Sequence, residues 1–286
     1  MSAPVSGLSA LAAPRDYVLD QPQFNFLRQL VNERTGIVLS DAKQEMVYGR
    51  LMRRIRALGL PGFAEYCALL RQHPEQEIGA LINAITTNLT SFFREPHHFD
   101  FLRDVALPEW VRTKGRVPRA RLWSAGCSTG EEPYSVAMTV YEALGRRAEN
   151  VAILGTDIDT NVLALAETGI YPLERIDSLE ASYRASFLRG TGANRDKIKV
   201  KPEIAGLIRF RPLNLVGHWP VIAPVDLVFC RNVVIYFNKD TQRQLFARFA
   251  NALTPGGYLI IGHAETLFNI SERFELIGRT IYRKRP

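Results

Sequence analysis

The sequence has 286 residues, of which 47% are hydrophobic and 23% charged. This composition is typical of a globular protein with one large core or two smaller ones, and no apolar run reaches the roughly 18 residues that a membrane span needs. Three cysteines, at positions 67, 127 and 230, form no CxxC pair, which argues against a disulfide framework or a zinc site and fits a reducing cytoplasm. The net charge of +7 suits either an acidic partner or a plain solvated basic surface.

Residues 1–19 are predicted to form a flexible N-terminal arm. They are small and weakly apolar, and Pro4 and Pro14 interrupt them. Because no basic region precedes the apolar stretch, the arm lacks the pattern of a secretion signal.

Residues 20–90 are predicted to form a helical N-terminal domain. Apolar residues recur at helical spacing in four segments, which capping residues, glycines and prolines separate. The first helix begins at Asp20 and Pro22 and ends at Gly36. The apolar stripes are Phe24, Leu27, Leu30 and Val31; Val47, Leu51, Ile55 and Leu58; Phe63 to Leu70; and Ile78, Leu81, Ile82 and Ile85.

Residues 118–286 are predicted to form an α/β domain, joined to the helices by a partly helical linker at 91–117. Short β-rich runs alternate with helical stretches, which predicts a doubly wound parallel sheet. The expected strands are Ala120–Ser124, Val151–Thr156, Val225–Cys230 and Tyr258–Gly262, with a late strand at Phe274–Arg283. The expected helices are Glu131–Leu144, Asn161–Glu167 and Thr241–Leu253.

The segment at about 171–210 interrupts this alternation. It contains the glycine-rich run at 188–192, followed by Lys197–Lys201 with a period of two. This pattern predicts a small antiparallel β-subdomain inserted in the sheet domain.

The strongest local motif runs from Arg121 to Tyr134, where a strand leads into a loop with Gly126 and Gly130 and then into a helix. The loop has neither the G-x-G-x-x-G of a dinucleotide site nor the G-K-[ST] of a phosphate loop. Two carboxylates, Glu131 and Glu132, would repel a phosphate and suit a cationic or hydroxyl-bearing ligand. S-adenosylmethionine has a sulfonium, an ammonium and ribose hydroxyls, and no phosphate.

Asp157 ends the next predicted strand. An acid at that place can accept both ribose hydroxyls, although Asp157 could instead cap the following helix. We favour the ribose role because a glycine loop precedes it, with Asp159 as the helix cap.

Five motifs in this order resemble the CheR-type chemotaxis receptor methyltransferases, over about residues 22–283. They are 88–95 (NLTSFFRE), 124–134, 156–159 (TDID), 229–237 (FCRNVVIYF) and 256–263 (GGYLIIGH). The resemblance implies an all-α N-terminal domain and a Rossmann-like methyltransferase domain that carries a β-subdomain. It further implies glutamate O-methylation on chemoreceptors, with S-adenosylmethionine as the methyl donor and S-adenosylhomocysteine as the product.

The resemblance also assigns the pocket residues. The implied cofactor-binding residues are Asn88, Thr90, Arg94, Glu132, Asp157, Asn214, Leu215, Arg231 and Asn232, and the implied catalytic residues are Arg94 and Tyr236. Glu131 stays an alternative to Glu132. A glutamate substrate is already ionised at pH 7, so the reaction needs no strong base, and we find no nucleophile–base pattern. His97 and His98 are expected to have structural roles, and no metal is predicted, because adjacent helical residues point about 100° apart.

Two surfaces are candidates for receptor docking. The first is a run of arginines on the second helix, where Arg53 and Arg56 lie opposite the apolar stripe, Arg50 flanks them and Arg54 lies near its edge. The second is the β-subdomain with Arg189, Gly190 and Gly192, where an edge strand could hold a receptor's C-terminal peptide. The alternatives are a solvated basic face for the first and a stabilising hairpin for the second.

The expected partners are therefore the cytoplasmic helices of chemoreceptors, with contact to the membrane only through them. A cytoplasmic monomer that binds no nucleic acid is expected. Two other functions stay open: a nucleic-acid methyltransferase, disfavoured because Cys230-Arg-Asn-Val-Val lacks the prolines of such active sites, and a non-catalytic S-adenosylmethionine-binding regulator. The intact pocket set argues against the second.

Overall fold

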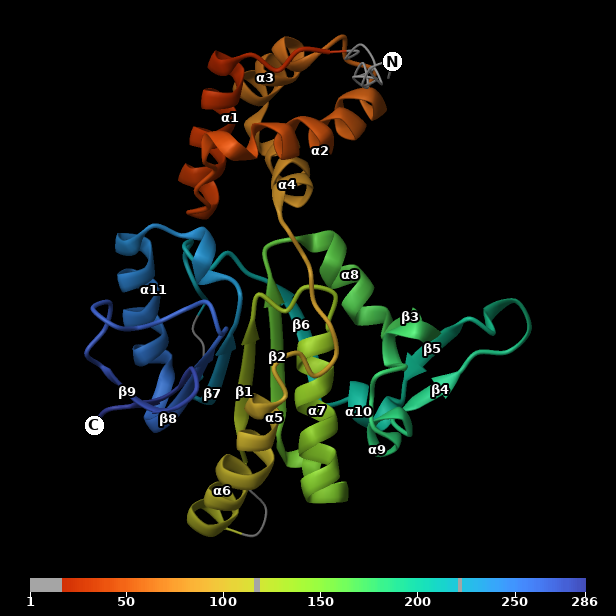
Figure 1. The fold of residues 1–286 in the computed structure, drawn as a ribbon, viewed down its shortest axis with the longest axis vertical. Coiled ribbons are helices and arrows are strands. Elements are labelled where there is room, and N and C mark those ends of the chain that lie inside the picture. Colours follow the sequence, from red (N-terminus) through yellow and green to blue (C-terminus); the bar gives the residue numbers. More distant parts are fainter. Residues whose placement is uncertain (1–16, 116–118, 221–222) are drawn as a thin grey trace, which may run out of the picture.

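The structure is a computed structural model that describes residues 17–115, 119–220 and 223–286 (Figure 1). Most of the predicted N-terminal arm, residues 1–16, lies outside the described residues. Within the described residues, no helix is long and apolar enough to cross a membrane.

The N-terminal unit is helical, as predicted. It comprises α1 (Gln21–Thr35), α2 (Gln44–Ala57), α3 (Phe63–Gln72) and α4 (Pro74–Ile85), with a 3-10 turn at Asp41–Lys43. Asp20 and Gln23 form a reciprocal capping box at the start of α1, and Gly36 ends the helix with a φ of 74°. The predicted stripes supply the core of this unit, with Phe24, Leu27 and Val31 buried from α1.

A second group of helices links this unit to the sheet. It comprises α5 (His97–Phe101), a π-helical turn at Leu102–Ala106 and α6 (Leu107–Lys114). Buried residues of this group, including Phe99, Leu102 and Trp110, pack on one face of the sheet.

The second domain contains a seven-stranded sheet in the order β6-β2-β1-β7-β8-β10-β9, in which β10 runs antiparallel to its neighbours β8 and β9. Its strands are β1 (Arg121–Ala125), β2 (Ala152–Asp157), β6 (Ile208–Pro212), β7 (Val225–Cys230), β8 (Leu253–Ile261), β9 (Phe274–Gly278) and β10 (Ile281–Lys284). The predicted doubly wound α/β fold is confirmed.

Helices cover both faces of this sheet. They are α7 (Glu131–Leu144), α8 (Thr160–Thr168) and α11 (Lys239–Ala252), with 3-10 turns at Gly145–Asn150 and Val234–Tyr236. Side chains alternate between two cores: Leu227 and Phe229 join the core with α5–α7, while Val228 and Cys230 join the core with α11. This explains why β7 is apolar without alternation from Leu227 to Cys230, because both of its faces are buried.

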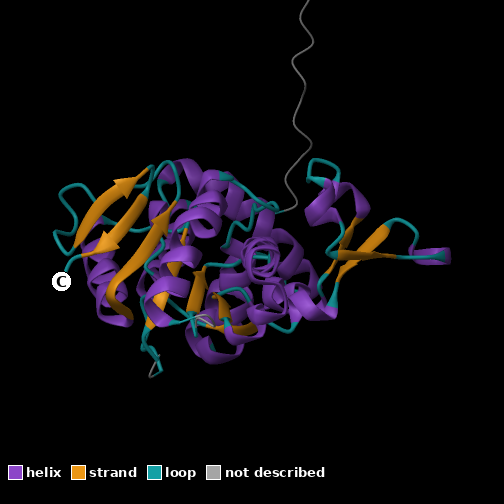
Figure 2. Ribbon diagram, turned by 90° about the horizontal axis from the view of Figure 1, so that it is seen from below, coloured by secondary structure: helices purple, strands orange, loops and turns teal. Residues whose placement is uncertain are grey.

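The predicted insertion forms a separate three-stranded antiparallel sheet that projects from the side of the domain (Figure 2). Its order is β3-β5-β4, with β3 (Ile170–Pro172), β4 (Phe187–Arg189) and β5 (Lys197–Val200). Short helices surround these strands: Leu173–Ile176, α9 (Ala181–Arg184), Gly192–Asn194 and α10 (Pro202–Ala205).

Two boundaries of the prediction were wrong. Ile208–Phe210, assigned to the insertion, belong to β6 of the main sheet, where Phe210 packs over Gly155 so closely that a Cβ there would lie 2.7 Å from its ring. The late strand at Phe274–Arg283 is a hairpin of two strands, because the chain turns at Arg279 and Thr280, where Thr280 has a φ of 56°.

Candidate functional site

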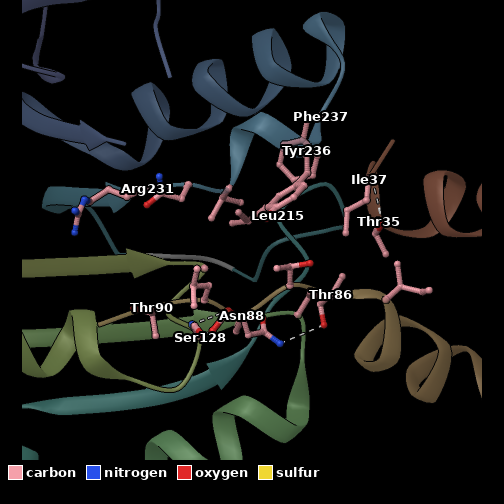
Figure 3. A pocket seen from close by; sticks show the side chains of 18 of the residues that line it. Thr35, Ile37, Thr86, Asn88, Thr90, Ser128, Leu215, Arg231, Tyr236 and Phe237 are labelled. Carbon is pink, nitrogen blue, oxygen red and sulfur yellow. Dashed lines mark hydrogen bonds between the residues drawn. The ribbon is translucent and has the colours of Figure 1, made fainter. Parts of the chain in front are cut away.

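A pocket lies beyond the carboxyl ends of the parallel strands, between the sheet domain and the helical unit (Figure 3). This is where ligands bind in open α/β sheets. The structure brings together there all ten residues that the sequence assigned to cofactor and catalysis: Asn88, Thr90, Arg94, Glu132, Asp157, Asn214, Leu215, Arg231, Asn232 and Tyr236.

The glycine loop is shaped by its own packing. Gly126 and Gly130 have φ angles of 87° and 97°. A Cβ on Gly126 would lie 2.4 Å from Val233 Cγ2, and one on Gly130 would lie 2.9 Å from Ala166 Cβ. Protein side chains therefore fill the space that the missing Cβ atoms of these two glycines leave.

Asp157 is buried at the end of β2 and lines the pocket. Its Oδ2 accepts from Ser128 N at 2.8 Å and its Oδ1 from Asp159 N at 3.0 Å. Burial raises the pKa of Asp157, and these backbone N–H groups oppose the rise. The helix cap is Asp159, which accepts from Asn161 N and Val162 N. The capping alternative for Asp157 is thus wrong.

Asp159 also fixes the segment between the two domains. Its Oδ2 accepts from Asn88 Nδ2 at 2.7 Å and from Thr86 Oγ1 at 2.8 Å. The Asn88 carbonyl in turn accepts from Ser128 Oγ at 2.9 Å. Asn88 is therefore held with its amide nitrogen toward Asp159 and tied to the glycine loop.

Arg231 is buried, with 2% of its side chain exposed. Its Nη1 donates to Glu132 Oε2 at 3.1 Å, and its Nη2 donates to the Arg94 carbonyl and lies 3.6 Å from Glu95 Oε1. Figure 3 shows its side chain pointing away from Tyr236. One cation thus joins the strand β7 to the start of α7 and to the linker.

The structure separates the two candidate acids of the glycine-loop helix. Glu132 lines the pocket and accepts from Ser124 Oγ at 2.7 Å as well as from Arg231. Burial raises the pKa of Glu132, and the charge of Arg231 and the hydrogen bond from Ser124 oppose this rise. Glu131 is fully buried and is not part of the pocket lining; it accepts from Thr129 Oγ1 and faces Arg175.

Arg94 and Tyr236 line the pocket from different parts of the chain, Arg94 from the linker and Tyr236 from the turn after β7. Arg94 lies in the linker and donates from Nη1 to the Leu89 carbonyl at 3.1 Å. Tyr236 ends the 3-10 turn after β7, and its carbonyl accepts from Val38 N at 2.9 Å. Figure 3 shows Tyr236 across the pocket from Asn88 and Thr90.

Sequence reasoning missed one wall of the pocket. The end of α1 and the residues after it line the pocket with Thr35, Ile37, Val38 and Leu39. The sequence predicted only that the helix ends at Gly36. This segment is joined to the sheet domain by the Ile37–Phe237 bridge and by a bond from Asn214 Nδ2 to the Arg34 carbonyl at 2.6 Å. No local motif signals such a contact, because it forms between residues about 180 positions apart.

His97 and His98 lie beside Arg231 rather than in the pocket lining. Their rings are 4.0 Å apart, and with Glu95 they offer three potential metal-ligand atoms within 4.8 Å of one another. The ring nitrogens of His97 and His98 therefore lie closer together than the 100° between neighbouring helical residues suggests. A divalent cation there would face the guanidinium of Arg231, which lies 3.6 Å from Glu95, so we assign no metal to this cluster.

The arginines of α2 divide into two kinds. Arg50 donates to the carbonyls of Ile85 and Thr86 and to Thr87 Oγ1. Arg54 donates from Nε and Nη2 to the two carboxylate oxygens of Glu77. Arg50 is half-buried and holds the end of α4, and its place in the docking patch stays a prediction. Arg53 and Arg56 are exposed.

The β-subdomain residues lie far from the pocket lining. Arg189 and Gly192 are exposed at the tip of the small sheet, and Gly190 lies against Asn194, where a Cβ would meet its carbonyl oxygen at 2.0 Å. Since β4 pairs only with β5 in this sheet, it is an edge strand.

The pocket lining fits S-adenosylmethionine. Glu132 and Asp157 set two buried carboxylates beside the glycine loop, which favours a cationic, hydroxyl-bearing ligand over a phosphate. Arg94 from the linker and Lys43 from the helical unit supply cations, to which a ligand carboxylate could bind.

Comparisons with known proteins agree with this chemistry. The family model "CheR methyltransferase, all-alpha domain" matches residues 22–86, and "CheR methyltransferase, SAM binding domain" matches residues 88–283. The chain is 46% identical to a chemotaxis protein methyltransferase of Klebsiella aerogenes, over 92% of this chain and 90% of the relative. It is 43% identical to that of Escherichia coli, over 92% and 91%, and 42% identical to chemotaxis protein methyltransferase 2 of Pseudomonas aeruginosa, over 98% and 99%.

The buried His98 makes the stability of the protein dependent on pH. Burial, and then the charge of Arg231, lower the pKa of His98 to about 3 from 6.5. The unfolded chain takes up a proton below pH 6.5 that the folded chain refuses, so stability is lost as pH falls from 6.5 toward 3. Between pH 6.5 and 5 we expect a loss of about 2 kcal/mol from this group.

Denaturant unfolding at several pH values measures this loss. His98→Gln should flatten the decline, while His73→Gln, at an exposed position, should leave it as in the wild type. Equal pH slopes for His98→Gln and the wild type would contradict the assignment.

Proposed function

The chain belongs to the CheR methyltransferase family, and from this premise we propose that it methylates glutamate side chains of chemoreceptors to form methyl esters. The family resemblance drawn from the sequence is confirmed, as are methyltransferase activity and S-adenosylmethionine as the cofactor. Receptor glutamates as the acceptor are the proposed part. This part is supported by the names of the relatives, which are chemotaxis protein methyltransferases.

The observation that carries the proposal is the composition of the pocket. It brings Tyr236 and Arg94 together with two acids, and the described residues that line it include no histidine or cysteine. A methyl transfer to an amine or hydroxyl must remove a proton, whereas a glutamate with a pKa near 4.3 is already an anion at pH 7. The lining therefore suits a carboxylate acceptor.

S-adenosylmethionine supplies an electrophilic methyl group when bound. Transfer of this methyl group to a glutamate oxygen would form a C–O bond and break the C–S bond without the movement of a proton. The protein contributes position and a dry environment, and holding two reactants in attack geometry can supply several kcal/mol.

Arg94 and Tyr236 have different proposed roles. A tight ion pair between Arg94 and the substrate would orient its carboxylate but weaken it as a nucleophile. We therefore assign Arg94 mainly to the cofactor carboxylate, with Asn88 beside it. Tyr236, across the pocket, would donate a hydrogen bond that aims the incoming glutamate.

These roles predict separate defects. Tyr236→Phe should lower the receptor methylation rate by about 10- to 100-fold because aim is lost, with cofactor affinity nearly unchanged. Arg94→Ala should weaken cofactor binding. Calorimetric titration with S-adenosylhomocysteine and a labelled-methyl assay measure the two effects, and normal methylation by both variants would overturn the assignment.

Receptor docking is proposed for Arg53 and Arg56 on the exposed face of α2. This helix starts at the rim of the pocket, where Lys43 and Met46 form part of the lining. A receptor segment that carries the glutamates to be methylated is acidic, so a basic face on a helix that begins at the pocket would attract and orient it.

Charge reversal tests this surface. Arg53→Glu with Arg56→Glu should lower kcat/KM for receptor by about 10-fold at low salt, because electrostatic steering is lost, and should leave cofactor affinity unchanged. The matched control is Arg146→Glu, an exposed arginine after α7 at the opposite end of the sheet. Equal losses in both variants, or none in either, would count against docking.

The edge strand β4 is proposed as a site for a receptor's C-terminal peptide. Its open edge permits strand addition, and Arg189 at its end could pair with a carboxylate. Such tethering raises the effective concentration of the substrate helices near the pocket.

A pull-down with receptor tail peptides tests the tether. We expect at least one tail to be retained by the wild type and lost with Arg189→Ala, while Arg184→Ala on α9 retains it. Failure of every tail to bind would remove this proposal and leave the catalytic one intact.

We further infer a monomer that works in the cytoplasm and meets the membrane only through its receptors. The alternative of a nucleic-acid methyltransferase lacks support in the loop after β7, where Cys230 is followed by Arg231 and Asn232 without prolines. A non-catalytic regulator would have no reason to keep Tyr236 in the pocket.

A further inference from the structure

Glu265 is a buried carboxylate that none of the assigned roles includes. It follows β8 and has 6% of its surface exposed. Its two oxygens accept five backbone N–H groups. Oε1 accepts from Val233 at 2.9 Å, Val234 at 2.9 Å and Ile235 at 3.3 Å, and Oε2 accepts from Asn232 at 3.0 Å and Gly262 at 2.6 Å.

Four of these donors are the consecutive residues 232–235, which run from the loop after β7 into the turn at Val234–Tyr236. The chain can point four successive N–H groups at one place only by leaving extended geometry, and Asn232 has a φ of 58°. Non-glycine residues rarely adopt this conformation, so something must hold it. The acceptor in the structure is the Glu265 carboxylate.

The packing around Glu265 is close. A Cβ on Gly262 would lie 2.6 Å from Asn232 Nδ2, 3.0 Å from Asn232 N and 3.0 Å from Glu265 Oε2. Gly262 thus leaves the space in which the two loops, after β7 and after β8, meet. Because β7 and β8 are parallel neighbours, both loops leave the sheet at the same edge as the pocket.

The held segment carries the reaction site. Asn232, Val233 and Tyr236 line the pocket, whereas Glu265 does not. Glu265 therefore has no direct contact with the pocket, and its effect on the reaction must pass through the segment it binds.

We propose that Glu265 is a positioning residue for methyl transfer: its carboxylate fixes the backbone of residues 232–235 so that Tyr236 is aimed at the acceptor. This inference rests on the proposed role of Tyr236. A carboxylate is needed because all five partners are donors. A glutamine would turn one NH2 group toward N–H groups, so that donor would face donor.

A role limited to stability makes a different prediction from a positioning role. If Glu265 only stabilised the fold, its loss would lower the melting temperature and the amount of active protein, and Tyr236 would contribute its full share in the protein that remains folded. If Glu265 positions Tyr236, the two residues act as a unit, and their losses do not multiply.

A double-mutant cycle of Glu265→Gln and Tyr236→Phe tests this. Glu265→Gln should lower kcat for receptor by about 10-fold or more, with KM for S-adenosylmethionine changed less than about 3-fold. In the Glu265→Gln background, Tyr236→Phe should cost less than about 3-fold. Glu272→Gln, an exposed acid seven residues later, is the matched control and should behave as the wild type.

Each outcome decides a separate point. Losses that multiply, or a normal kcat for Glu265→Gln, would overturn the inference. A wild-type chain that methylates no receptor would instead remove the proposed function. Should Glu265→Gln fail to fold, Gly262→Ala keeps the charge and disturbs the same contact, and the same cycle with Tyr236→Phe applies to it.

Discussion

The buried guanidinium of Arg231 is the interaction on which the rest of the site depends. It binds Glu132 at the start of α7 and the Arg94 carbonyl in the linker, and it lies near Glu95. Segments about 100 or more residues apart in the chain therefore meet at one charge. Removal of that charge would leave Glu132 buried without a counter-ion, a change that usually costs a few kcal/mol.

The same cluster explains the preference for a cationic ligand. Arg231 faces two acids, and Asp157 adds a third carboxylate that hydrogen bonds from Ser128 and Asp159 hold at the pocket. The backbone geometry of the glycine loop serves this arrangement. Gly126 makes room for Val233, and Val233 belongs to the segment that Glu265 binds. Cofactor binding and the placement of Tyr236 thus share one packed region.

Much of this could be predicted from the sequence. The strand β7 and the helix Glu131–Leu144 were predicted with the bounds that the structure has, because both are marked locally, β7 by its run of apolar residues and the helix by Gly130 and Gly145 at its ends. The family resemblance assigned ten residues to the site, and the structure places all ten in one pocket. Contacts between distant segments gave no local signal: the wall at Thr35–Leu39, the anchoring of Arg50 to the end of α4, and the pairing of Ile208–Phe210 with β2. Helical spacing says which face Arg50 is on but not which carbonyls lie within its reach.

The pocket identifies the methyl donor better than the acceptor, so the acceptor is the point to measure. The chain should be incubated with labelled S-adenosylmethionine and, in parallel, with receptor cytoplasmic domain, with RNA and with no substrate. We expect label on the receptor that mild base releases as methanol, which marks a methyl ester. Base-stable label on the receptor, or label on RNA alone, would contradict it.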